Sequence, residues 1–349
     1  MSDFTIKLLN LIREGKTANE IAQELNISNK LLYTRIVNLK NKGFLFDRKY
    51  YYDGNIVYVP KMDLLNNNDI SLITKSSDKE LTLVVISDLH IGNDYQRIDL
   101  LKSVYDYCAK EGINIIINAG DLVDGTLGTT KKLYPNPIEQ IDYAMQIYPF
   151  DKNILNFTLL GNHDFSVLKE TGQNLALLIQ NYRHDIIPIG YGKGQISIKN
   201  DKIIVSHPID EITFDAKLDN KTLLLKGHSH KFKFHFDCNH TIVKVPSLSD
   251  LSLGADNQIP TLLKININFN NSGLIEKGVI NQLLIADKVY TLNELDFFFY
   301  HNITEEKNIK LEEEQTNITK EQTTPNQLKL IKKEERLSQI ERFNKRYGL

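Results

Sequence analysis

The sequence contains a short stretch, residues 85–90, in which a carboxylate and an imidazole lie two positions apart. The apolar run 81–86 predicts a buried strand, so Asp88 and His90 fall on the loop that follows it. On such a loop both side chains can turn to the same side and share one metal ion. Carboxylate oxygen and imidazole nitrogen are typical ligands of Mn, Fe and Zn. Because this pair also occurs often by chance, it predicts a metal site only together with other motifs.

Four further motifs rich in metal-ligand residue types follow in order along the chain. They are Gly120-Asp121-Leu122-Val123-Asp124, Gly161-Asn162-His163-Asp164, Ser206-His207-Pro208 and Gly227-His228-Ser229-His230. Most of them come after an apolar, β-branched run, at 113–117, 154–160, 203–205 and 223–225. In open α/β sheets, functional groups collect at the carboxyl ends of the strands. The five motifs therefore predict one common metal centre.

At these motifs the chain resembles the calcineurin-like metallophosphoesterase superfamily, in its nuclease and phosphodiesterase branch, over roughly residues 80–265. The resemblance implies a four-layer α/β/β/α sandwich and a hydrolase with two divalent metal ions, Mn²⁺ first, with Fe or Zn as alternatives. One ion would be held by Asp88, His90, Asp121 and His230, and the other by Asp121, Asn162, His207 and His228. A carboxylate with two oxygens suits the bridging position, which falls to Asp121. Glycines before Asp121, Asn162 and His228 predict tight turns there.

The resemblance also implies a catalytic pair. His163 follows the ligand Asn162 and would face the substrate, as proton donor or as stabiliser of the transition state. Asp124 matches the position that supplies its anionic partner in phosphatases and phosphodiesterases, where DNA-repair nucleases usually carry histidine. Gly125 stands where Ser/Thr protein phosphatases carry a phosphate-binding arginine, which argues against protein phosphatase activity.

Residues 1–60 predict a separate small module of three helices and a β-hairpin. The first helix ends at Gly15, Thr17 and Glu20 form a capping box for the second, and Ser28 caps a third helix over residues 29–42. Two β-prone runs follow, with a turn at residues 53–54. This order, and above all the second helix, resembles a winged helix-turn-helix.

In such a module the third helix would enter the major groove of a nucleic acid. Eight side chains are candidate nucleic-acid contacts, six in the module and two on the loop after Asp124. They are Lys30, Tyr33, Arg35, Asn38, Lys42, Arg48, Lys131 and Lys132. Lysine and arginine can reach phosphates, and asparagine can read base edges. The alternative is a solvated helix face used for dimerisation or protein contacts, with the two loop lysines merely exposed.

The chain of 349 residues predicts more than one domain. We expect a winged helix at 1–60, a flexible polar linker at 61–80, the metallophosphoesterase domain at 81–302, and a charged, partly helical or disordered tail at 303–349. A net charge of −2 gives no overall attraction to nucleic acid or membranes, so any such attraction must be local. Without an apolar run long enough for a membrane span or a signal sequence, we expect a cytoplasmic protein that does not bind membranes.

The leading functional prediction is a two-metal phosphoesterase that hydrolyses phosphodiester bonds in nucleic acid, with the winged helix recruiting the polymer. One alternative is a phosphomonoesterase or cyclic-nucleotide phosphodiesterase with a regulatory or dimerising winged helix. Another is a DNA-binding regulator whose phosphoesterase domain senses a nucleotide. The choice between DNA and RNA and the existence of a homodimer stay open at this point.

Overall fold

The computed structural model describes residues 3–41, 46–60, 70–75, 77–128, 131–209, 221–236, 240–250 and 259–299. The chain divides into two compact units, residues 1–300 and 301–349, and all described residues belong to the first. Lys42 and the predicted tail at 303–349 therefore lie outside the described residues. None of the helices described has the length and apolar character needed to span a bilayer.

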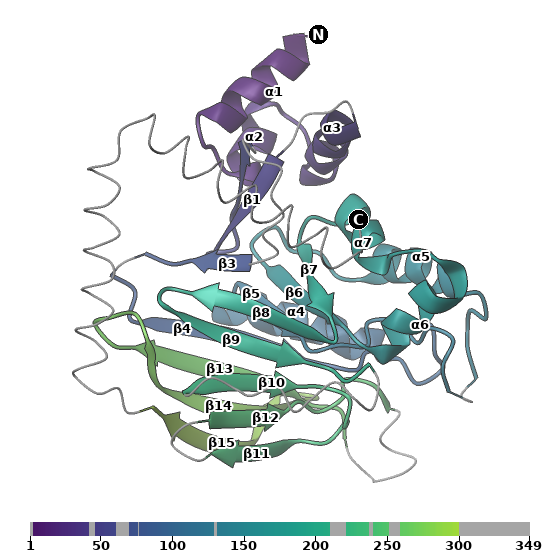
Figure 1. Cartoon of the computed structure of the whole chain (residues 1–349), viewed down its shortest axis with the longest axis vertical. Coiled ribbons are helices and arrows are strands. Elements are labelled where there is room, and N and C mark those ends of the chain that lie inside the picture. Colours follow the sequence, from purple (N-terminus) through teal and green to yellow (C-terminus); the bar gives the residue numbers. More distant parts are fainter. Residues whose placement is uncertain are drawn as a thin grey trace, which may run out of the picture. The chain divides into compact units, whose positions relative to one another are not determined.

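The described helices lie within the first 182 residues, and the described strands lie between Phe46 and Phe298 (Figure 1). The helices are α1 (Asp3–Arg13), α2 (Ala18–Glu24), α3 (Asn29–Asn41), α4 (Ile98–Glu111), α5 (Pro137–Ile147), α6 (Asn162–Thr171) and α7 (Leu175–Tyr182). The strands are β1 (Phe46–Tyr51), β2 (Ile56–Pro60), β3 (Ile70–Ile73), β4 (Glu80–Ile86), β5 (Ile115–Asn118), β6 (Leu155–Leu160), β7 (Ile186–Tyr191), β8 (Lys193–Ile198), β9 (Asp201–Ser206), β10 (Thr222–Lys226), β11 (Lys233–Phe236), β12 (His240–Lys244), β13 (Leu262–Phe269), β14 (Ile275–Ile285) and β15 (Val289–Phe298).

The strands form two mixed sheets. The seven-stranded sheet has the order β15-β14-β13-β4-β5-β6-β7, and its strands β4, β5, β6 and β7 run parallel to one another. The eight-stranded sheet has the order β11-β12-β10-β9-β8-β3-β1-β2, with β9, β10 and β12 parallel. This is the α/β architecture with two mixed sheets that the metallophosphoesterase resemblance implies.

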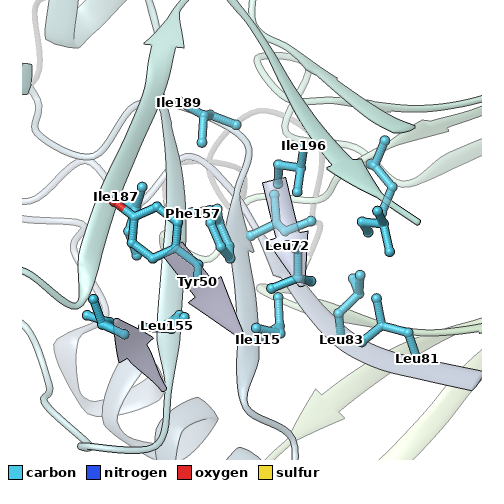
Figure 2. Packing of buried hydrophobic residues seen from close by; sticks show 14 of the residues in the cluster. Tyr50, Leu72, Leu81, Leu83, Ile115, Leu155, Phe157, Ile187, Ile189 and Ile196 are labelled. Atoms are coloured by element: carbon cyan, nitrogen blue, oxygen red, sulfur yellow. The ribbon is translucent and has the colours of Figure 1, made fainter. Parts of the chain in front are cut away.

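Alternating residues of β4 separate two hydrophobic cores. Leu83 and Val85 belong to the core that contains side chains of both sheets (Figure 2), whereas Val84 and Ile86 belong to a second core with helices α4 to α7. Because successive side chains of a strand point to opposite faces, the parallel part of the seven-stranded sheet, β4 to β7, is buried on both sides. This double burial explains why its parallel strands read as nearly continuous apolar runs.

The predicted four-layer sandwich is only partly present. Helices α4 to α7 form one helical layer on the seven-stranded sheet. Beyond Tyr182, however, the described residues contain no α-helix, so the second outer helical layer is not found in that part of the chain. The described elements after Tyr182 are the strands β7 to β15.

The N-terminal module has the predicted order of elements, α1 to α3 followed by the β1–β2 hairpin. The capping box is confirmed, since Thr17 accepts a hydrogen bond from the Glu20 backbone and the Glu20 carboxylate accepts one from the Thr17 backbone. The Ser28 hydroxyl accepts a hydrogen bond from the Leu31 backbone at the start of α3, as predicted. The identity of the module as a winged helix stays a prediction.

The expectation of a flexible linker at 61–80 is wrong for its central part. Residues 70–73 form β3, which pairs in parallel with β1 on one side and with β8 on the other. Leu72 is only 2% exposed, and Tyr50 of β1 packs edge-on against Phe157 of β6 at 5.7 Å between ring centroids (Figure 2). The module therefore shares a sheet and a core with the rest of its unit. The alternation of Ile70 and Leu72 lies within a mostly polar stretch and is too short a pattern to predict a strand.

Candidate metal centre

The predicted ligands all lie where a strand ends. Asp88 and His90 follow β4, Asp121 follows β5, and Asn162 is the first residue of α6 after β6. In the other sheet, His207 follows β9, and His228 and His230 follow β10. Strands β4, β5 and β6 are parallel neighbours in one sheet, and β9 and β10 in the other. The fold therefore brings seven residues from five separate stretches of sequence to one place.

The backbone at the ligands is strained. Eight described non-glycine residues have a positive φ, and five of them are predicted ligands, Asp88, His90, Asp121, His228 and His230. Left-handed backbone is unfavourable for residues with a Cβ and persists only where the surrounding structure imposes it. Such conformations cluster at functional sites, and here they turn successive side chains toward the centre.

Three glycines before ligands allow the close approach of neighbouring strand ends. A Cβ on Gly120 would lie 2.1 Å from His207 Nδ1, and one on Gly161 would lie 2.2 Å from Asp121 Oδ1. A Cβ on Gly227 would lie 2.4 Å from the Ala119 carbonyl oxygen. The structure gives a more specific reason for these glycines than the predicted tight turns. At each one, a methyl group would displace part of the centre.

One cluster of donor atoms surrounds Asn162. Its Oδ1 lies 3.1 Å from His207 Nε2 and 3.1 Å from His228 Nδ1, and His207 Nε2 is 3.0 Å from Asp121 Oδ2. The other ring nitrogen of His207 is 2.9 Å from the Ala119 carbonyl, which accepts its proton and so turns Nε2 toward the cluster. This is the arrangement expected of a histidine that offers Nε2 to a metal ion.

A second cluster surrounds Asp88. Its Oδ1 lies 3.3 Å from His230 Nε2 and 4.0 Å from His90 Nε2, and His90 Nε2 is 3.8 Å from Asp121 Oδ2. Asp88 Oδ1 and His90 Nε2 are buried without a hydrogen-bond partner. Leaving buried polar atoms unsatisfied is costly, and a bound cation would satisfy them. The donor set therefore fits a metal ion, and the two clusters together fit a binuclear site with Asp121 in common.

The electrostatics of the centre favour charged ligands. Burial opposes ionisation of Asp121, but the neighbouring imidazoles, His207 first among them, hold the pKa of its carboxyl well below the ordinary value. Burial likewise opposes protonation of His207, yet the charge of Asp121 and its hydrogen bond outweigh this and raise the pKa of His207 to about 10. Without a metal ion, a proton on His207 takes the place of the cation that the carboxylates attract.

His163 lies against the predicted partner, Asp124, but its shortest contact is with the main chain of that residue. Its Nδ1 is 2.7 Å from the backbone carbonyl of Asp124, whereas the Asp124 carboxylate is 3.8 Å away. Because a carbonyl can only accept, Nδ1 carries a proton and Nε2 is left for another partner. Ring atoms of His163 also lie within reach of His90 and Asp121, so His163 forms a third possible metal-binding group with them. Asp124 still orients His163, but through its main chain.

Sequence reasoning overlooked the role of Asp164. This buried carboxylate accepts hydrogen bonds from the backbone N–H groups of Leu122, Val123 and Gly161, at 2.9–3.1 Å. It thereby ties the loop after Asp121 to the loop before Asn162. Burial, followed by the charge of Asp121, raises the pKa of Asp164 to about 7. The position of Asp164 directly after His163 in the third motif was the sequence signal that could have indicated this role.

The candidate nucleic-acid contacts do not share one environment. Lys30, Arg35 and Asn38 are exposed on α3. Arg48 is half-buried, with its guanidinium 5.9 Å from the centre of the Tyr50 ring.

Two candidates depart from the expectation of a free surface. Tyr33 is 7% exposed and stacks on His184, so its ring does not face solvent. Lys132 is paired with Asp124 at the metal centre, whereas its neighbour Lys131 is largely exposed. Tyr33 was predicted from its spacing on the third helix and Lys132 from its position on the loop after Asp124, and tertiary packing buries most of both side chains.

Residues 81–249 match the calcineurin-like phosphoesterase family, so this part of the chain is a calcineurin-like phosphoesterase domain. Together with the Asp and His clusters, the match defines the domain as that of a metal-dependent phosphoesterase, a class of enzymes that hydrolyse phosphate esters.

Individual relatives are distant. The DNA polymerase II small subunit of Halobacterium salinarum (strain ATCC 29341 / DSM 671 / R1) is 26% identical, across 43% of this chain and 34% of the relative. The chain thus spans about a third of the length of the curated relatives it matches. Among solved structures, the phosphoesterase Yfce from E. coli is 16% identical, with a TM-score of 0.35, over 61% of this chain and 100% of that chain. A novel archaeal phosphodiesterase is 14% identical, with a TM-score of 0.35, over 57% and 99%.

Proposed function

We propose that the protein is a two-metal phosphodiesterase that cleaves nucleic acid. The observation that carries the proposal is the complete donor set, Asp88, His90, Asp121, Asn162, His207, His228 and His230, gathered at the ends of five strands. When bound, a pair of divalent ions, Mn²⁺ first, supplies a nucleophilic hydroxide and compensates the charge that builds on the phosphoryl oxygens.

The chain's own residues have distinct parts in this proposal. Asp121 belongs to both clusters and serves as the bridge, and its low pKa keeps it ionised. Asn162 contributes a neutral amide oxygen. His163 is held through Nδ1 by the Asp124 carbonyl, which leaves Nε2 to meet the leaving oxygen or the phosphoryl group.

Two observations support a nucleic-acid substrate. Lys30, Arg35 and Asn38 lie exposed on α3, the helix that a winged helix-turn-helix uses for groove contacts. The name of the curated relative, a DNA polymerase II small subunit, points to a DNA-related setting for that protein. Since the net charge of the chain is −2, polymer binding must come from such local basic groups.

Hydrolysis assays test the proposal. Full-length protein with Mn²⁺ is incubated with labelled single- and double-stranded DNA and RNA, beside a small generic diester and a monoester. We expect polymer cleavage that falls steeply with salt, since cationic contacts to phosphates release counterions. Lys30→Ala with Arg35→Ala lowers polymer cleavage but not diester hydrolysis; Lys110→Ala, an exposed lysine of α4, is the matched control. Monoester hydrolysis alone would exclude the proposal.

A second candidate is a phosphomonoesterase or cyclic-nucleotide phosphodiesterase in which the module has a structural or regulatory part. The observation that favours it is the docking of α3, whose Tyr33 stacks on His184 of the phosphoesterase domain. This candidate predicts that the Lys30 and Arg35 substitutions change neither substrate class. A deletion of residues 1–70 is a poor test, because it removes strands of a shared sheet.

A further inference from the structure

Two adjacent lysines on the loop after Asp124 have opposite environments. Lys132 Nζ lies 2.5 Å from Asp124 Oδ2 and donates to the Leu127 carbonyl at 2.8 Å, and its side chain is 16% exposed. Lys131 is 82% exposed, and its Nζ is 3.2 Å from Asp94 Oδ2. The metallophosphoesterase motifs do not include either residue, and only Lys132 reaches the metal centre.

The carboxylate that Lys132 holds has its other oxygen turned toward a metal ligand. Asp124 Oδ1 accepts a hydrogen bond from Asn93 Nδ2 at 3.0 Å and lies 3.4 Å from His90 Nδ1. The opposite nitrogen of His90, Nε2, is the one that faces Asp88 and Asp121. Lys132, Asp124 and His90 thus form a continuous chain from the protein surface to the donor atoms.

We propose that Lys132 is a positioning residue of the metal centre: by holding Asp124 Oδ2, it directs Oδ1 at His90 Nδ1 and so aims His90 Nε2 at the ion. Outer carboxylates fix the orientation and tautomer of ligating histidines and strengthen them as ligands. Asn93 donates to Oδ1, and among the described residues Lys132 is the only lysine or arginine that pairs with this buried carboxylate. The proposal rests on the metal centre of the proposed function and not on its nucleic-acid substrate.

The competing role, contact with a substrate phosphate, fits the geometry less well. The Lys132 ammonium already has two oxygen partners, and the Asp124 side chain that it neutralises is 1% exposed. Swinging Lys132 out to a phosphate would leave a buried carboxylate without its cation, which is costly. Lys131, exposed and next in sequence, can reach a phosphate without that loss.

Metal affinity tests the proposal without any substrate. Metal-free full-length protein is titrated with Mn²⁺ against a competing chelator, for the wild type, Lys132→Met, Lys132→Arg and Lys131→Met. We expect Lys132→Met to weaken binding of one of the two ions by about 10–100-fold, the usual cost of losing an outer partner. Lys132→Arg keeps most of the affinity, and Lys131→Met binds both ions like the wild type.

A double variant tests whether Lys132 affects metal affinity through Asp124 or directly. In Asp124→Asn protein, Lys132→Met should add no further loss of metal affinity, because the group through which it acts is already altered. Far-UV circular dichroism and thermal unfolding of the metal-free variants test whether they fold. If Lys132→Met does not fold, Lys132→Gln replaces it.

Two results would overturn the proposal: wild-type metal affinity in Lys132→Met with a raised KM for a diester, or an undiminished effect of Lys132→Met in the Asp124→Asn background. A failure to cleave nucleic acid contradicts the proposed substrate and leaves these metal titrations unaffected.

Discussion

The imidazole of His184 lies face to face with the phenol ring of Tyr33, with ring centroids 4.2 Å apart and an interplanar angle of 17°. A second tyrosine of the N-terminal module, Tyr58, places its hydroxyl 2.6 Å from His184 Nδ1. His184 itself precedes β7 of the phosphoesterase domain and is 2% exposed. The module and the domain are therefore joined by a buried aromatic contact as well as by the shared sheet, and this contact makes the stability of the protein sensitive to acid.

Acid should weaken the protein through His184. Burial, with the charges of Arg48 and Lys40, lowers the pKa of His184 to about 2, whereas in the unfolded chain it lies near 6.5. Below about pH 6.5 the unfolded chain takes up a proton that the folded protein refuses, so stability falls with falling pH, by up to about 1.4 kcal/mol per pH unit. Urea unfolding of the metal-free protein from pH 7.5 to 5 measures this slope.

The His184→Gln variant isolates that contribution. It should be less stable than the wild type at pH 7.5, because the stacking on Tyr33 is lost, and the difference should shrink as the pH falls. His235→Gln, at an exposed position of β11, is the matched control and should keep the wild-type slope. A difference between His184→Gln and the wild type that stays constant from pH 7.5 to 5 would show that His184 does not carry the acid sensitivity.

Removal of metal should abolish catalysis. The donor atoms include Asp88 Oδ1 and His90 Nε2, which are buried without a hydrogen-bond partner. Exhaustive chelation should therefore abolish hydrolysis, and Mn²⁺ should restore it. Asp121→Asn should be the most damaging ligand substitution, because Asp121 belongs to both clusters. Metal analysis should find up to two equivalents in the wild type and fewer in the variant; Asp142→Asn, exposed on α5, is the control. Activity that survives chelation would refute the metal centre.

The His163→Ala variant should separate chemistry from metal binding. We expect both ions to remain bound while the rate of diester hydrolysis falls by about 10²–10⁴-fold, the usual effect of losing an acid–base group. Metal content and single-turnover rates are measured on the same preparation. His163 also lies in a possible metal-binding group with His90 and Asp121. Loss of one equivalent of metal in His163→Ala would therefore make it a ligand and not a proton donor.

The Asp164→Asn substitution should loosen the centre although Asp164 holds no metal. Its two oxygens accept three backbone N–H groups, and an amide would turn an NH₂ group toward at least one of them. Each hydrogen bond to a carboxylate contributes about 1.5–3 kcal/mol, so we expect a loss of roughly that size in unfolding free energy. Weaker Mn²⁺ binding should accompany it, since the loop after Asp121 loses its anchor. Unchanged stability and metal affinity would contradict this anchoring role.

The sequence alone was sufficient to predict the metal centre. Each predicted ligand lies near the end of an apolar run, and the motifs that carry the family resemblance are local, so Asp88 and His207 could be predicted as ligands without knowing how their strands meet. The capping box at Thr17 was readable for the same reason, because it depends on residues three apart. The α/β architecture was predicted from the family resemblance that the five motifs carry.

Only the tertiary structure decided which side chains and strands become partners. Nothing in the spacing of Lys131 and Lys132 tells which one turns toward Asp124, because that choice depends on the path of the loop over β5 and α5. The strand at 70–73 is stabilised by neighbours more than a hundred residues away on one side, through its pairing with β8. Tyr33 reads as an exposed helix residue until His184 covers it. Long-range packing is the physical reason in each case, since it assigns a partner that no local pattern names.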